Sequence, residues 1–353
     1  MFRNTVKESD MVFPREVLIG GGYINRITEL CRKLKVGKRI LIVTGKTTKS
    51  LVAERVFDDL SDRKFDCDIV VEERATEDSV NTVKEVGKNR DLLMGIGGGS
   101  KIDIAKLASF SLNIPFISVP TAASHDGIAS PRASIKRNGT SISVEASAPM
   151  AIVADTSIIA KSPYRLTASG CADLIAKKSA LKDWELAHRL KGEPFSSFAS
   201  SLAMLACDTI IENASNIKEG LEESAWIVVK SLVLSGVSMS IAGSSRPASG
   251  SEHLFAHALD GVAPGKALHG EECGVGTIMM LYLHGEDWTK AKEVLKKIKA
   301  PTNAKELGVS DEAILEALTT AHKIRKDRYT ILGDNGITPR AAENVARITG
   351  VIQ

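Results

Sequence analysis

The first 155 residues alternate short apolar runs with segments of helical periodicity, and this alternation restricts the fold more than any other feature. The apolar runs predict buried strands at residues 39–45, 65–73, 91–98, 115–120 and 150–155. Helical segments follow the first three of these runs. Strands that alternate with helices in this way form a parallel sheet with helices packed on its faces. The first part of the chain therefore predicts an α/β domain.

A different pattern interrupts the alternation between residues 133 and 147. The segment "ASIKRNGTSISVEAS" places Asn138 and Gly139 between two β-rich runs. An Asn-Gly pair readily adopts the positive backbone angles of a two-residue hairpin turn. We therefore expect an antiparallel hairpin beside the parallel strands.

The strand pattern ends near residue 160. Ser162 and Pro163 form a helix-start signal, and nearly everything that follows has helical periodicity. We expect two domains: a Rossmann-like parallel-sheet domain at residues 1–160 and an all-helical domain at residues 161–353.

Composition narrows the range of functions. The 353 residues include 46 basic and 43 acidic side chains, for a net charge of +3, which argues against binding to nucleic acid or to an anionic membrane. The five cysteines never form a CxxC pair, as is typical of reduced thiols in the cytoplasm. The longest apolar stretch, residues 226–243, carries Lys230 and several serines and predicts a buried helix. We expect a cytoplasmic protein without a secretory signal, which forms a homo-oligomer.

A glycine-rich loop follows the third predicted strand. In "MGIGGGSKIDIAK", glycines let the backbone approach a phosphate closely, and the first N–H groups of the next helix favour an anion. The pattern is neither GxGxxG nor GxxxxGK[ST]. We interpret the loop as a phosphate-binding turn, the alternative being a tight strand-to-helix connection. Asp103 could bind a sugar hydroxyl or simply stabilise the first helical turn.

Candidate metal ligands lie in the second half of the chain. His253 and His257 are four residues apart, a spacing that places both imidazoles on one face of a helix. His269 opens a later helix, and Asp173 lies among small residues, where a carboxylate needs a partner or a metal. The remaining candidates, His188, His284 and His322, fall on charged helical segments and are expected to be solvated.

Five segments together resemble a known family. "GIGGGSKIDIAK", "VPTAASHDGIASP", "ASGCADLIAK", "RPASGSEHLFAHALD" and "ALHGEECGVGTIMM" occur in the order found in the group III metal-dependent alcohol dehydrogenases. That group shares its fold with glycerol dehydrogenase and dehydroquinate synthase, which implies a cleft between the two domains. Within the group, the chain is most similar to the archaeal members that reduce dihydroxyacetone phosphate to sn-glycerol 1-phosphate for ether lipids.

The resemblance implies specific roles for residues of both halves of the chain. One divalent metal, usually zinc, would be held by Asp173, His253 and His269. Asp126 and His257 would be the catalytic residues and would contact the substrate, as would Asp173. Cys273, four residues after His269, is expected to be a buried structural cysteine instead of a ligand.

The resemblance also implies a bound NAD(H) or NADP(H). The expected cofactor-binding residues lie in the glycine loop, in the segment after the fourth strand and at the end of the first strand: Gly97, Gly98, Gly99, Ser100, Lys101, Asp103, Thr121, Ala122, Ser124, Ser130, Thr44 and Gly45. An acid at the end of the first strand would repel the 2′-phosphate of NADP. The sequence there, "VTGKTTKS", contains no acid. We therefore expect NADP(H) to be accepted, unless these are ordinary solvated turn residues.

The substrate phosphate has several candidate donors. These are Arg132, Lys177, Lys178, Arg246 and the turn at residues 249–251. Two alternative functions stay open: oxidation of unphosphorylated polyols by an enzyme of the same fold, and non-catalytic binding of a nucleotide or a metal.

Overall fold

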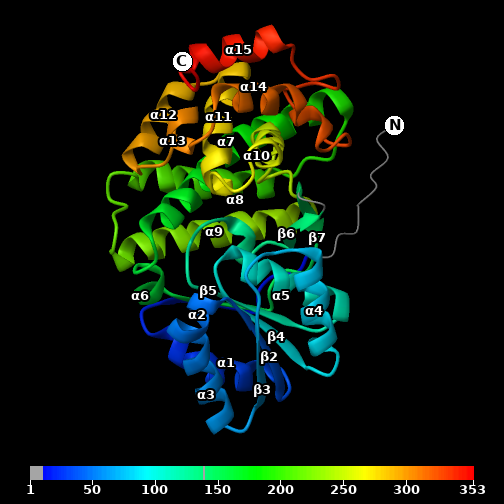
Figure 1. Ribbon diagram of the computed structural model, residues 1–353, viewed down its shortest axis with the longest axis vertical. Helices are drawn as coiled ribbons and strands as arrows, with labels where there is room; N and C mark the ends of the chain where they lie inside the picture. The colour runs from blue at the N-terminus through cyan, green and yellow to red at the C-terminus, as the bar shows by residue number, and fades with distance from the viewer. Residues whose placement is uncertain (1–10, 138–139) are drawn as a thin grey trace.

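Six strands form one fully parallel sheet, in the order β1–β8–β5–β4–β2–β3, in a computed structural model that describes residues 11–137 and 140–353 (Figure 1). A separate antiparallel pair, β6–β7, forms a hairpin beside it. The parallel strands are β1 (Glu16–Gly20), β2 (Arg39–Thr44), β3 (Asp66–Val71), β4 (Leu92–Gly97), β5 (Phe116–Pro120) and β8 (Ala151–Asp155), and the hairpin strands are β6 (Arg132–Arg137) and β7 (Thr140–Glu145).

Helices cover both faces of the sheet, because successive residues of a buried strand point to opposite sides. Ile40 and Ile42 of β2 pack in the apolar cluster that contains α1 and α3. Leu41 and Val43 pack in the larger cluster that contains α4 and α5. The helical elements of this part are η1 (Tyr23–Arg26), α1 (Ile27–Leu34), α2 (Lys46–Thr48), η2 (Lys49–Ala53), α3 (Glu54–Asp62), α4 (Glu77–Gly87), α5 (Gly99–Leu112) and η3 (Asp126–Ile128).

The five strands expected from the apolar runs are all present, and β1 is an additional strand that the sequence analysis missed. β1 lies at the edge of the sheet, and its side chains are only partly buried. Its apolar run, Val17 to Ile19, precedes the alternation of strands and helices by which the other parallel strands were identified. The hairpin forms as expected, but its turn at residues 138–139 lies outside the described residues.

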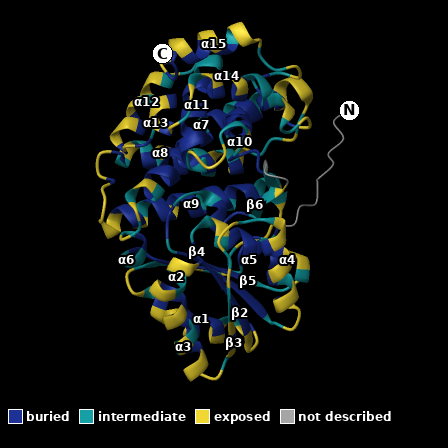
Figure 2. Cartoon of the chain, in the orientation of Figure 1, coloured by how far each residue is buried: buried dark blue, intermediate teal, exposed yellow. Residues whose placement is uncertain are grey.

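The chain after β8 is helical throughout its described length (Figure 1). Its helices are α6 (Thr156–Ile159), α7 (Tyr164–Lys191), α8 (Ser197–Asn213), α9 (Glu222–Ala242), α10 (Ser251–Val262), α11 (His269–Leu283), α12 (Trp288–Lys297), α13 (Ala304–Leu307), α14 (Asp311–Thr320), η4 (Ala321–Lys323) and α15 (Pro339–Ile348). Long stretches of α7, α9 and α11 are buried in this half (Figure 2). By length and composition α9 could cross a membrane, but 61% of its apolar window is buried, as in the core helix that the sequence predicted.

The two halves touch where α7 meets the segment that follows β5. A Cβ atom on Gly170 would overlap the carbonyl oxygen of Ala123, so only glycine allows this approach. The contact brings the carboxyl edge of the sheet against α7, the helix that carries Asp173. The close packing of these two backbones therefore sets the distance between the two halves of the site.

We expect Gly170→Ala to lower the free energy of unfolding by about 1 to 3 kcal/mol, because the added methyl group forces α7 away from the loop. Gly261→Ala is the matched control, since Gly261 also lies in a helix and a Cβ there meets nothing within 4 Å. The control should be neutral or more stable by up to ~1 kcal/mol. Urea denaturation of the two variants tests this, and an undisturbed Gly170→Ala would contradict the packing argument.

Candidate active site

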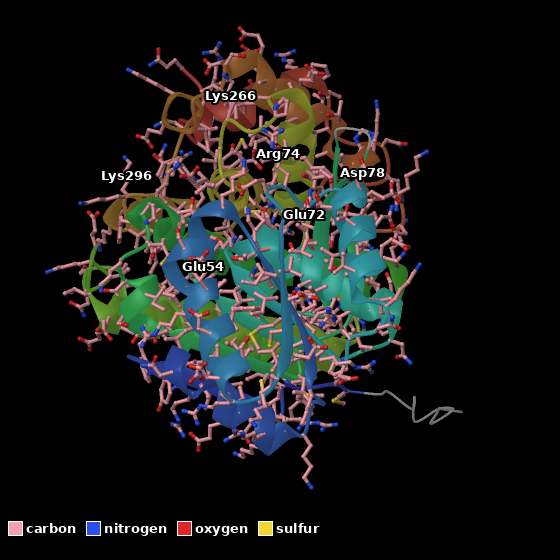
Figure 3. All side chains as sticks on the ribbon, turned by 60° about the horizontal axis from the view of Figure 1, so that its bottom comes forward. Glu54, Glu72, Arg74, Asp78, Lys266 and Lys296 are labelled. Carbon is pink, nitrogen blue, oxygen red and sulfur yellow. The ribbon has the colours of Figure 1, made fainter. Side chains whose placement is uncertain are left out.

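A cleft of about 850 Å³ opens between the carboxyl edge of the sheet and the helical half. Its walls come from the glycine loop, the segment after β5, the β6–β7 hairpin, and the helices α10 and α11. Two exposed charged residues lie at its rim (Figure 3). Arg74 is a lining residue of the cleft, and Lys266 is next to the lining residue Ala267. Ligands of open parallel sheets bind at this edge of the strands.

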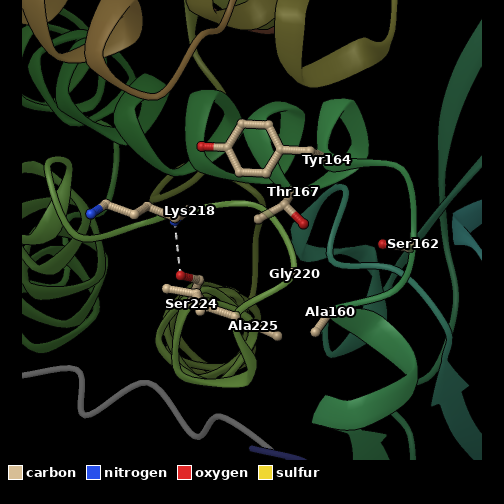
Figure 4. Close-up of a pocket in the computed structure, with 9 residues that line it drawn as sticks. Ala160, Ser162, Tyr164, Thr167, Lys218, Gly220, Ser224 and Ala225 are labelled. Carbon is tan, nitrogen blue, oxygen red and sulfur yellow. Dashed lines mark hydrogen bonds between the residues drawn. The ribbon is translucent and has the colours of Figure 1, made fainter.

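The much smaller pocket in Figure 4 lies elsewhere, between α6, α7 and the start of α9. Its volume of about 10 Å³ holds at most one water molecule. The backbone N–H of Lys218 donates to Ser224 Oγ at 2.9 Å beside it. This pocket is too small for a substrate, so the cleft is the candidate site.

The glycine loop joins β4 to α5 at the cleft. Gly98 is the N-cap of α5, and a Cβ on Gly99 would overlap the imidazole of His125. His125 Nδ1 accepts from the N–H of Gly127 at 3.0 Å, so its Nε2 carries the proton and lies at the amino end of α5. The sequence analysis did not single out His125, since its place over a loop some 25 residues earlier comes only from the fold. A donor at the amino end of α5 suits an anion.

The residues expected to bind the cofactor fall into two groups. Eight line the cleft: Gly98, Gly99, Ser100, Lys101, Asp103, Ala122, Ser124 and Ser130. Four are not among its lining residues: Thr44, Gly45, Gly97 and Thr121. Asp103 is largely occupied by the protein, since its carboxylate pairs with the buried Lys106 at 3.3 Å and accepts from the N–H of Ser134 at 3.1 Å. The sequence suggested a sugar ligand or a helix-stabilising acid at Asp103, but not this contact between α5 and the hairpin.

An acid does lie at the end of β2, contrary to the reading of the sequence there. Glu73, just beyond β3, accepts from the backbone N–H of Lys46 at 2.6 Å, and this contact lowers the pKa of Glu73. Lys101 passes over Gly45 and donates to the carbonyl of Glu73 at 2.6 Å. The sequence suggested no acid because Glu73 arrives from the neighbouring strand. The carboxylate of Glu73 and the ammonium group of Lys101 therefore both lie near the end of β2.

Four potential metal ligands converge at the other end of the cleft. One donor atom each from Asp173, His253, His269 and Cys273 lies within 4.8 Å of the others. His253 Nε2 is 3.6 Å from Asp173 Oδ1, and Cys273 Sγ is 3.6 Å from His269 Nε2. Ligands on one tetrahedral zinc ion lie about 3.4 to 3.8 Å apart, given bonds of about 2.0 to 2.3 Å. The donor set therefore fits a divalent metal, and the thiol of Cys273 lies closer to it than the sequence suggested.

Glu252 fixes the orientation of His253. The fully buried carboxylate accepts from His253 Nδ1–H at 2.8 Å, from the N–H of Gly250 at 2.7 Å and from Ser179 Oγ at 2.8 Å. An ionised carboxylate only accepts, so Nδ1 donates to Glu252 and Nε2 is the ring atom that faces Asp173. Such carboxylate–histidine pairs are typical of metal sites. The sequence could not predict this pair, because neighbours on a helix do not normally face each other.

A buried lysine joins the metal group to the substrate side of the cleft. Lys177 Nζ lies 2.8 Å from Asp173 Oδ1 and 2.9 Å from Asp126 Oδ2. Asp173 Oδ2 accepts the backbone N–H of Asp126 at 3.0 Å, and Ser235 Oγ donates to Asp126 Oδ2 at 2.8 Å. Burial alone would lower the pKa of Lys177, but the two carboxylates raise it, so the ammonium stays charged. Oδ1 of Asp126 is left for a ligand in the cleft.

The pKa values of His257 and His269 are lowered, which favours their neutral forms. Burial, with His253 as the next cause, lowers the pKa of His257 to about 4. Burial and the two neighbouring histidines also lower the pKa of His269. Neutral imidazoles can coordinate a metal or exchange protons without carrying a charge.

The expectation that His188, His284 and His322 are all solvated was wrong for two of them. His188 is exposed as expected, but His284 is folded onto α7, where its Nε2 lies 3.1 Å from the buried carboxylate of Asp183. His322 is partly buried, and its Nδ1 has no partner among the described residues. Charged neighbours in the sequence concealed the fact that these two rings face inward.

Comparisons with known proteins agree with this fold. The family model of the iron-containing alcohol dehydrogenases matches residues 18–163. A probable glycerol dehydrogenase from Sinorhizobium meliloti superimposes with a TM-score of 0.79 at 20% identity, over 97% of this chain and 98% of the other. An iron-containing alcohol dehydrogenase from Thermotoga maritima gives 0.72 at 21% identity, over 97% and 99%. The fold is that of the iron-containing alcohol dehydrogenase class.

Relatives of similar sequence identify the family within this class. A glycerol-1-phosphate dehydrogenase [NAD(P)+] from Methanosarcina mazei is 56% identical over 97% of this chain and 96% of its own length. Enzymes of the same name from Methanobrevibacter smithii and Thermococcus sibiricus are 52% and 50% identical, over 96% and 97% of this chain and 98% of their own lengths. The chain belongs to the glycerol-1-phosphate dehydrogenase family.

We expect the metal-free protein to bind one zinc ion per chain and His269→Ala to lose it. Glu252→Gln should weaken binding about 10- to 100-fold, since Nδ1 of His253 loses its fixed acceptor. Cys273→Ala should keep the affinity within about threefold, because a catalytic zinc needs only three protein ligands. Competition with a chelating dye measures all three. A thiolate charge-transfer band in the cobalt-substituted protein would instead make Cys273 a fourth ligand.

The neutral state of His257 predicts a pH dependence of stability in the metal-free protein. In the unfolded chain His257 takes up a proton below about pH 6.5, whereas in the folded protein it does so only near pH 4. The free energy of unfolding should therefore fall across this window, with roughly 3 kcal/mol from His257. Denaturant titrations should show a shallower decline for His257→Gln and no change for the exposed His188→Gln. An equal decline in all three proteins would refute the assignment.

Proposed function

We propose that the protein catalyses the reversible, NAD(P)-dependent reduction of dihydroxyacetone phosphate to sn-glycerol 1-phosphate, the backbone of archaeal ether phospholipids. The observation that carries this proposal is the identity of 50–56% to enzymes of that name over nearly the whole chain. The site geometry supports it, since a metal-donor group and a glycine loop line the same cleft.

Two bound groups would supply the chemistry. A divalent ion at Asp173, His253 and His269 would provide a Lewis acid for the C2 oxygen, and the reduced nicotinamide would provide the hydride. We propose zinc as the ion, because one carboxylate and two imidazoles with an open position are typical of catalytic zinc sites.

The residues around these groups would position the substrate and move its proton. Asp126, held at Oδ2 by Lys177 and Ser235, would accept a substrate hydroxyl at Oδ1 and turn one face of C2 toward the nicotinamide. His257 lines the cleft beside the metal group, with its ring 5.5 Å from that of His269. As a neutral imidazole it would relay a proton to the substrate oxygen in the reductive direction and take it back in the reverse direction. Closure of the cleft around the reactants would exclude water.

A comparison of substrates tests the proposed function. The zinc-loaded protein should oxidise NADPH or NADH with dihydroxyacetone phosphate, and with dihydroxyacetone far more slowly. Chiral analysis should identify the product as sn-glycerol 1-phosphate. A preference for dihydroxyacetone would favour a polyol dehydrogenase, and no turnover with any triose would favour a non-catalytic binding protein.

Glu73 should influence the choice of cofactor. The nicotinamide end would face the segment after β5, which approaches Asp173, and the adenosine end would then extend toward β2 and Glu73. A carboxylate there favours a free ribose 2′-hydroxyl over a 2′-phosphate. We expect Glu73→Gln to raise the NADPH-to-NADH ratio of kcat/KM about five- to tenfold, since one surface charge contributes about 1 kcal/mol. Glu54→Gln, an exposed acid on α3, is the control, and an unchanged ratio in Glu73→Gln would contradict this placement.

A further inference from the structure

The side chain of Lys101 lies across the carboxyl ends of β2 and β4. A Cβ on Gly45 would come within 2.5 Å of Lys101 Cε, and a Cβ on Gly97 within 2.9 Å of its Cγ, so the two glycines leave room for this path. At the end of the side chain, Nζ donates to the carbonyl of Glu73, just beyond β3, at 2.6 Å. One side chain from the first turn of α5 therefore spans the ends of three neighbouring strands.

The strand order reverses at the same place. From β2 the chain continues to β3, and from β4 it continues to β5, on the opposite side of this strand pair. The helix α3 between β2 and β3 packs on one face of the sheet, and α5 between β4 and β5 packs on the other. Open α/β sheets bind dinucleotides across the crevice at such a point. A dinucleotide in this crevice would lie over Lys101, with its two nucleosides on opposite sides of that residue.

The position of the metal donors decides which nucleoside lies on which side. The segment after β5 approaches these donors, since the backbone N–H of Asp126 donates to Asp173 Oδ2 at 3.0 Å. The nicotinamide would therefore lie near β5. β3 is three strand spacings away, or about 14 Å. The adenosine half would then reach the carboxyl end of β3, where Glu73 and Arg74 follow the strand.

Two cationic side chains line the cleft at this end. Arg74 and Lys101 are both lining residues, together with the glycine loop. Lys101 Nζ contacts the carbonyl that joins Glu73 to Arg74, so its ammonium group and the backbone of Arg74 are neighbours. Within residues 11–137 and 140–353, Arg74 forms no ion pair, and Lys101 Nζ has no acceptor besides this carbonyl. Both side chains therefore keep hydrogen-bond donors for an anion.

The other charged side chains near the end of β2 have partners or lie outside the cleft. Glu73 Oε1 accepts the backbone N–H of Lys46 at 2.6 Å. Lys46 is not among the residues that line the cleft, and Lys49 Nζ lies 3.8 Å from the carboxylate of Glu54. A carboxylate near the adenosine ribose favours a free 2′-hydroxyl, whereas an arginine accommodates a 2′-phosphate. The loop after β3 thus carries one group suited to each form of the cofactor.

We propose that Arg74 and Lys101 bind the 2′-phosphate of NADP(H), and that Glu73 binds the 2′-hydroxyl when NAD(H) occupies the same place. The guanidinium of Arg74 can hold a phosphate through two parallel hydrogen bonds, and the ammonium of Lys101 adds a point charge beside it. The adjacent residues Glu73 and Arg74 would then allow one cleft to use both cofactors. The inference rests on the proposed function, since that function supplies the nicotinamide cofactor.

Steady-state kinetics of the zinc-loaded variants Arg74→Ala and Lys101→Met test the proposal. We expect kcat/KM for NADPH to fall ~10-fold in each, and kcat/KM for NADH to stay within about threefold, because only NADPH carries the 2′-phosphate. Arg74→Lys keeps the charge without the paired hydrogen bonds and should lose less than Arg74→Ala. Arg63→Ala is the control, because Arg63 is exposed, pairs with Asp59 and precedes the opposite end of β3. An unchanged kcat/KM for NADPH, or equal losses with both cofactors, would overturn the proposal.

A binding measurement separates this inference from the proposed function. Calorimetry gives the affinity of the zinc-loaded protein for adenosine 2′,5′-bisphosphate relative to that for 5′-AMP, which lacks the 2′-phosphate. This ratio should fall ~10-fold in Arg74→Ala and should not change in Arg63→Ala. Should the ratio depend on Arg74 in a protein that reduces no dihydroxyacetone phosphate, the proposed function fails and the 2′-phosphate site stands. A ratio unchanged in both Arg74→Ala and Lys101→Met overturns the site, whatever the enzyme reduces.

Discussion

The site depends on one buried ammonium group between two carboxylates. Lys177 is fully buried and contacts Asp173 on its own helix and Asp126 from the segment after β5. Without Lys177, two neighbouring buried carboxylates would be left without a countercharge, which is strongly destabilising. The same contact connects the sheet half to the helical half where the metal donors and the substrate would meet. The site is therefore complete only when the two halves have packed together.

This arrangement engages both oxygens of Asp173 but only one oxygen of Asp126. Asp173 gives Oδ2 to the backbone of Asp126, and Oδ1 faces both Lys177 and His253. Asp126 gives Oδ2 to Lys177 and Ser235 and keeps Oδ1. Together with Glu252, which sets the tautomer of His253, the protein determines the direction of each donor before any ligand arrives. Such preorganisation costs stability and favours chemistry in a fixed orientation.

The sequence predicts those features that depend on residues close together in the chain, and it fails for those that depend on residues far apart. The other parallel strands, the hairpin and the helical half are predicted because apolar periodicity and turn signals are local. The edge strand β1 precedes the strand–helix alternation that identifies the others. The group of Asp173, His253 and His269 could be anticipated through family resemblance, and the structure brings their donor atoms together. The contact of Glu73 with the backbone beside Gly45 and the position of His125 over Gly99 depend on chain segments that meet only in the folded protein.

The pairing of β1 with β8 has a consequence for biosynthesis. Within residues 11–137 and 140–353, β1 has a single neighbour in the sheet, and that neighbour is β8, about 130 residues downstream. During translation, residues 16–20 must wait unpaired until residue 155 has left the ribosome, while β2, β3, β4 and β5 can already associate. The amino-terminal segment is thus the last part of the sheet to be added, which makes this edge the slowest to form and the most open to mispairing with other nascent chains.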